Sequence, residues 1–98
     1  MSWLVAVLLV AALGVPARTH TVEIRGMEFH PAELTVAVGD TVVWINRDIV
    51  PHTATTQDWD TGLLSQGQSG RTVAPHAGTV RYVCNLHPMM RGTLVIRD

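Results

Sequence analysis

The chain of 98 residues has one cysteine, no lysine and few aromatic side chains. Its lone cysteine, Cys84, excludes an intrachain disulfide, iron–sulfur clusters and the structural zinc sites that need several thiolates. The H-E-x-x-H motif of many catalytic zinc sites is also absent. Seven cationic side chains, all arginine, nearly balance eight acidic ones, so neither nucleic acid nor an anionic membrane is expected as the main partner.

Long hydrophobic runs are also lacking. The apolar run from Trp3 to Val15 is too short to span a bilayer, which takes about 20 such residues. It ends in small residues at Val15-Pro16-Ala17, at the offsets that suit signal peptidase. We therefore expect a cleaved secretory signal at residues 1–17, a single domain at residues 18–98, and a periplasmic or secreted location. The alternative is an uncleaved anchor, because no Lys or Arg precedes the run.

Beyond residue 17, apolar and polar residues alternate with a period of two in short β-branched runs. Many short strands separated by Gly, Pro and Asp indicate an all-β sandwich or barrel, because each half-apolar sheet needs a second sheet to cover it. No segment has a long amphipathic helix pattern. The expected strands are residues 21–25, 34–38, 41–46, 53–56, 70–73, 79–84 and 93–97.

The expected strand at residues 79–84 places Val80, Tyr82 and Cys84 on one face. Cys84 is therefore predicted at the inward-facing end of a strand. Trp44 is expected in the core, and Trp59, which lies between two aspartates, is expected as a partly exposed cover.

Three potential metal donors follow one another in the pattern Cys84-x-x-His87-x-x-Met90. Taken singly, such a Cys or Met is usually a core residue and such a His is usually solvated. The joint spacing favours a metal site, because one loop leaving a buried strand presents a thiolate, an imidazole and a thioether together. His52, preceded by Pro51, supplies a second imidazole if the two strand ends are neighbours.

The donor set suits copper. One thiolate and one thioether are soft enough for Cu(I), and two imidazoles also suit Cu(II). A His₂Cys arrangement with a weak axial Met is typical of the type 1 blue copper centre, which carries one electron. The predicted ligands of a single copper ion are His52, Cys84, His87 and Met90.

Residues 27–97 resemble the plastocyanin and amicyanin branch of the small blue copper proteins, the cupredoxins. The resemblance implies a Greek-key β-sandwich with copper at one end, bound at His52, Cys84, His87 and Met90. The short loop from Cys84 resembles that of amicyanin, so Met90 rather than Met89 is expected as the axial ligand. The matching segments are Met27-Glu28-Phe29, residues 38–46, Pro51-His52, Ala77-Gly78-Thr79, Tyr82-Val83-Cys84 and residues 87–92.

The sequence departs from the family pattern at two places. Thr53 follows the first His where the family commonly has Asn, so the polar link between the ligand loops is expected to be weaker or differently made. The segment at residues 54–70 is shorter than in amicyanin, so amicyanin's own dehydrogenase is not assigned as the partner.

These features predict a soluble, monomeric periplasmic one-electron carrier rather than an enzyme. A dehydrogenase or a cytochrome is the expected class of redox partner. His87 would be the exit for the electron, ringed by a docking patch of Pro51, Pro88 and Met89; ordinary loop packing is the alternative reading of that patch. Copper delivery or sequestration is the competing function. An enzyme is disfavoured because no His-x-His pattern of multicopper oxidases is present.

His20 is a candidate for a secondary Cu(II) site. Cleavage after Ala17 would start the chain at Arg18-Thr19-His20, whose amine, amides and imidazole can form a square-planar chelate. An uninvolved terminus is the alternative.

Overall fold

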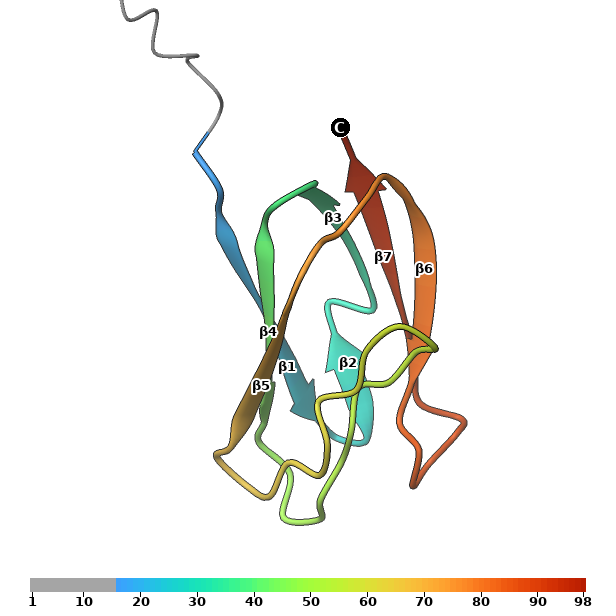
Figure 1. The fold of residues 1–98 in the computed structure, drawn as a ribbon. Coiled ribbons are helices and arrows are strands. Elements are labelled where there is room, and N and C mark those ends of the chain that lie inside the picture. Colours follow the sequence, from blue (N-terminus) through green and yellow to red (C-terminus); the bar gives the residue numbers. More distant parts are fainter. Residues whose placement is uncertain (1–15) are drawn as a thin grey trace, which may run out of the picture.

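The computed structural model describes residues 16–98 as seven strands in two sheets (Figure 1). Nearly all of the expected signal segment lies outside the described residues. Between residues 16 and 98, no helix is long and apolar enough to cross a membrane.

The two sheets form a sandwich in which the chain changes sheet after β2, β3 and β5. This confirms the predicted all-β Greek-key architecture. The first sheet has the order β2-β1-β4-β5, with β1 at Thr19–Arg25, β2 at Glu28–His30, β4 at Thr41–Asn46 and β5 at Ser69–Val73. The second has the order β3-β7-β6, with β3 at Glu33–Ala37, β7 at Arg91–Arg97 and β6 at Gly78–Val83.

Alternation along the strands builds the core between the sheets. In β4, Val42, Trp44 and Asn46 are buried, and the residues between them are half-buried on the outer face. The ring of Trp59 lies 4.7 Å from that of Trp44, measured between centroids, and Trp59 is half-buried. Both tryptophan predictions are confirmed, and an aromatic stack therefore fills the middle of the sandwich.

The structure has one strand that was not predicted and lacks one that was. The short strand β2 was not predicted, because three residues are too few to show a period; it forms because Gly26 and Met27 turn the chain back with positive φ angles of 60° and 61°. The expected strand at residues 53–56 is absent, and Thr55 makes only isolated bridges. Cys84 lies one residue beyond β6 and is fully buried, so its inward position is confirmed.

Tyr82 and Gly92 face each other across the antiparallel pair of β6 and β7. A Cβ atom on Gly92 would lie 2.1 Å from Cζ of the Tyr82 ring. The ring is held there by edge-to-face contacts with Phe29 and Trp44. Gly92 is therefore the residue that lets the Tyr82 ring lie flat across β7.

Replacing Gly92 by Ala is expected to lower the free energy of unfolding by about 2 kcal/mol or more, since the new methyl group must displace a packed ring. Urea unfolding of the metal-free protein measures the change. The control is a double-mutant cycle with Tyr82→Leu, in which the cost of Gly92→Ala should shrink. An equal cost in both backgrounds would show that the ring is not its cause.

Candidate metal centre

The Cys84–Met90 loop extends beyond the end of β6 and returns as β7 (Figure 1). Backbone hydrogen bonds close it into a tight turn: Cys84 N–H donates to the Met90 carbonyl at 3.1 Å, and Met90 N–H donates to the His87 carbonyl at 2.8 Å. The His87 N–H also donates to the Cys84 carbonyl at 3.3 Å. The three potential donors, Cys84, His87 and Met90, therefore belong to one closed loop. Met90 is buried in it, with 5% of its surface exposed.

His52 reaches the same place from the connection between β4 and β5, and its side chain is fully buried. Its backbone exchanges two hydrogen bonds with Leu64, at 3.1 and 2.8 Å. The buried side chain of Asn46 fixes this connection by donating to the carbonyls of Val50 and Leu64, at 2.9 and 2.8 Å. The second imidazole therefore arrives from a distant segment, as the sequence analysis expected.

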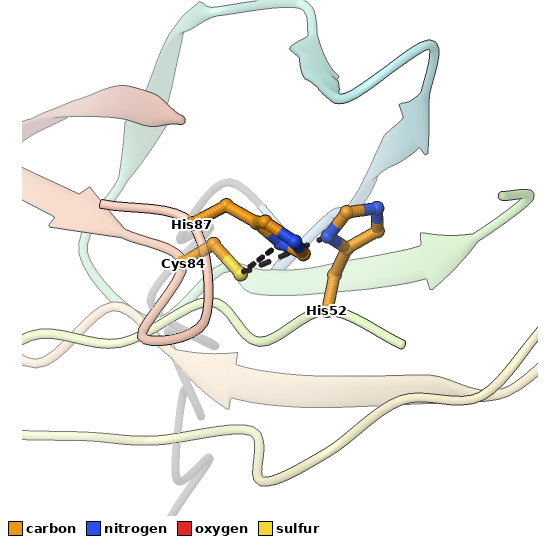
Figure 2. Close-up of side chains that lie close together, drawn as sticks. All are labelled: His52, Cys84 and His87. Atoms are coloured by element: carbon orange, nitrogen blue, oxygen red, sulfur yellow. Dashed lines mark hydrogen bonds between the residues drawn. The ribbon is translucent and has the colours of Figure 1, made fainter. Parts of the chain in front are cut away.

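Both imidazoles face the sulfur of Cys84, and the dashed lines in Figure 2 join it to one nitrogen of each ring. Its distance is 3.7 Å to Nδ1 of His52 and 3.8 Å to Nδ1 of His87, and the three atoms lie within 4.8 Å of one another. Donors about 2.0–2.3 Å from an ion and about 120° apart would be separated by about 3.7 Å. The two sulfur–nitrogen distances therefore fit a trigonal metal ion.

Thr53 links the two ligand loops. Its N–H donates to the Cys84 sulfur at 3.4 Å, and its hydroxyl accepts the N–H of Asn85 at 2.9 Å. The same hydroxyl lies 2.9 Å from that of Thr55, which donates to Asp60 at 3.0 Å. Since the proton of Thr55 goes to Asp60, Thr53 donates to Thr55. A polar link between the two ligand loops is thus present although Thr53 stands where the family commonly has Asn. It is made by the Thr53 hydroxyl, which accepts a main-chain N–H.

Asp48, which the sequence analysis missed, contacts the outer nitrogen of His52. Its Oδ2 lies 2.9 Å from Nε2 of His52, and its carboxylate also accepts the N–H groups of Gly26 and Met27. Burial raises the pKa of Asp48, but the hydrogen bonds from Met27, His52 and Gly26 outweigh it and hold the pKa below its ordinary value. An ionised Asp48 places the ring proton of His52 on Nε2, which leaves the Nδ1 lone pair facing Cys84. The one feature of the sequence that could have indicated Asp48 is its position four residues before His52.

His20 does not join this group. It lies in β1, where its Nε2 is 2.8 Å from Oδ2 of Asp40, and the backbone N–H of Arg18 donates to Oδ1 of Asp40 at 2.9 Å. The hydrogen bonds from Arg18, Ala37 and His20 lower the pKa of Asp40 to about 2. A copper chelate at His20 would have to break these contacts and the pairing of β1; that site stays a prediction.

The three residues of the expected docking patch, Pro51, Pro88 and Met89, are all exposed, and Met89 is 93% exposed. His87 is half-buried. Further exposed apolar side chains occur in the same connections, among them Ile49 at 86% and Leu86 at 49%.

Comparison with known proteins decides the family. A sequence model described as copper binding proteins of the plastocyanin/azurin family matches residues 17–60. The chain is 36% identical to amicyanin of Paracoccus denitrificans over 93 residues, which covers 88% of this chain and 71% of that protein. The chain is a cupredoxin. Amicyanin of Paracoccus versutus is 31% identical over 94 residues, covering 89% of this chain and 71% of that protein.

Solved structures agree. The Cu(I) form of an amicyanin point mutant matches this cupredoxin with a TM-score of 0.76 and 33% identity, covering 89% of each chain. A copper-containing nitrite reductase from Thermus scotoductus matches with a TM-score of 0.77 and 26% identity, covering 87% of this chain but only 24% of that one. With the donor group around Cys84, these matches establish copper as the cofactor, one type 1 ion in this cupredoxin.

Replacing Thr53 by Val is expected to lower the free energy of unfolding of the metal-free protein by about 1–3 kcal/mol, because the N–H of Asn85 loses its acceptor. Thr21→Val is the matched control, since Thr21 is exposed in β1, and its effect should stay within about 0.5 kcal/mol. Equal urea midpoints for the two variants would contradict the role given to the Thr53 hydroxyl.

Proposed function

We propose that this cupredoxin is a one-electron carrier whose copper is held by His52, Cys84, His87 and Met90. The observation that carries the proposal is the buried Cys84 sulfur lying 3.7 and 3.8 Å from the Nδ1 atoms of two imidazoles. When bound, copper supplies a centre that alternates between Cu(II) and Cu(I). The thiolate and the Met90 thioether favour Cu(I), and the two imidazoles also suit Cu(II).

The protein residues hold the donors in place for both oxidation states. His52 and Cys84 are fully buried, and backbone hydrogen bonds close both ligand segments. Donors that cannot move require little rearrangement when an electron arrives or leaves. The same burial favours a carrier over a delivery protein, whose metal must exchange readily.

His87 is the proposed exit for the electron. It is half-buried, whereas His52 and Cys84 are buried, so it is the donor of these three that a partner can approach. Pro51, Pro88 and Met89 form the proposed docking patch, an exposed apolar surface carried by the two ligand loops. A small apolar contact suits brief encounters with a redox partner, for which we propose a dehydrogenase or a cytochrome.

We further propose that residues 1–17 are a secretory signal and that the protein works in the periplasm as a monomer. β1 begins at Thr19, the second residue after the proposed cleavage point. The backbone nitrogen of Arg18 lies 2.9 Å from Oδ1 of Asp40, so cleavage after Ala17 would place a new ammonium group beside a carboxylate.

The intact mass of the protein recovered from the periplasm tests the cleavage. The expected chain begins at Arg18. A mass that retains residues 1–17, with the protein in the membrane fraction, would contradict the signal and indicate an anchor.

The redox proposal predicts that Cu(II) added to the purified protein gives an intense blue thiolate-to-copper absorption, which ascorbate bleaches and a mild oxidant restores. Cys84→Ser should abolish the band, whereas Thr21→Val should keep it. A wild-type protein that stays colourless after Cu(II) is added would contradict the proposal. Removal of copper by a Cu(I) chelator within seconds would favour delivery instead.

A further inference from the structure

The carboxylate of Asp48 joins His52 to the turn between β1 and β2. Its Oδ1 accepts the N–H of Gly26 at 2.7 Å. Its Oδ2 accepts the N–H of Met27 at 2.9 Å and lies 2.9 Å from Nε2 of His52. The backbone N–H of Asp48 donates to Oδ1 of the buried Asn46 at 2.9 Å. Side chain and main chain of Asp48 are therefore both fixed.

The turn that receives this carboxylate has an unusual backbone. Among residues 16–98, Met27 is the one non-glycine residue with positive φ, at 61°, and it follows Gly26 at 60°. Such a residue costs about 1 kcal/mol or more unless its surroundings hold it. Successive N–H groups in a turn of this kind converge on one point and attract an anion. Asp48 occupies that point.

We propose that Asp48 is a positioning residue for the copper: it fixes the tautomer of His52 and adds negative charge to that imidazole, which favours Cu(II) and slows loss of the metal. A carboxylate that accepts the outer N–H of a metal-binding His raises the basicity of the ring. A more basic ligand stabilises the more highly charged ion more strongly. The inference rests on the proposed assignment of His52 as a ligand.

Asp40 provides a matched control within the same chain. Its carboxylate accepts the backbone N–H groups of Arg18 and Ala37, at 2.9 and 3.0 Å, and contacts Nε2 of His20 at 2.8 Å. The arrangement repeats that of Asp48, two amides and one imidazole, but His20 is not a member of the donor group around Cys84. Asp40→Asn and Asp48→Asn thus each remove one carboxylate charge that contacts two backbone nitrogens and one imidazole, and of the two only Asp48 contacts a proposed copper ligand.

The experiment compares Asp48→Asn, Asp48→Glu and Asp40→Asn in the copper-loaded full chain by reduction potential and Cu(II) affinity. Asp48→Asn should shift the one-electron equilibrium toward Cu(I) by about tenfold, which equals about 59 mV. It should also weaken Cu(II) binding by about 10–100-fold. Asp40→Asn should lower stability but shift the equilibrium less than about twofold, and Asp48→Glu should recover most of the wild-type potential.

Nitrogen NMR of the His52 ring in the metal-free wild type measures the tautomer independently of the copper experiments. The expected tautomer carries its proton on Nε2; a proton on Nδ1 would overturn the proposal even if Asp48→Asn failed to fold. Equal potentials for Asp48→Asn and Asp40→Asn would also overturn it while leaving the carrier function intact. A wild-type protein that stays colourless with Cu(II) would instead contradict the proposed function. The tautomer of His52 would still show whether Asp48 orients the ring.

Discussion

The structure depends on keeping one thiol and one imidazole, Cys84 and His52, fully buried at the end of a sandwich. Burying polar groups without partners is costly, so each must be satisfied within the protein. The sulfur receives the N–H of Thr53, and the outer nitrogen of His52 meets Asp48. The sulfur also lies 3.7 Å from Nδ1 of His52, within hydrogen-bond distance for a thiol. In the proposed site, a bound copper ion would replace this contact by bonds to both atoms.

The sandwich supplies the rigidity that this arrangement needs. β6 and β7 carry the two ends of the Cys84–Met90 loop, and they are paired over the whole length of β6. Behind them, the packed rings of Trp44, Trp59 and Tyr82 occupy the space between the sheets. Close-packed cores resist deformation. Donors anchored to such a core keep their positions when the charge of a bound ion changes, and this is how the fold serves electron transfer.

Much of this could be predicted from the sequence because the signals were local. Period-two alternation indicated the sandwich, and the spacing from Cys84 to Met90 indicated the donor loop. The missed features depend on contacts between distant segments. β2 forms next to the turn at Gly26 and Met27. Thr55 bridges to two different segments, at Asp60 and Val83, in place of one continuous strand pairing. Asp48 is recognised only when the β1–β2 turn lies beside it.

The central claim is that the protein holds the donor geometry before copper arrives. Crystal structures of the metal-free, Cu(II) and Cu(I) forms test it directly. The account predicts that the Cys84 sulfur and the Nδ1 atoms of His52 and His87 superimpose within about 0.5 Å in the three forms. A metal-free form in which His52 or the Cys84–Met90 loop adopts another conformation would contradict it.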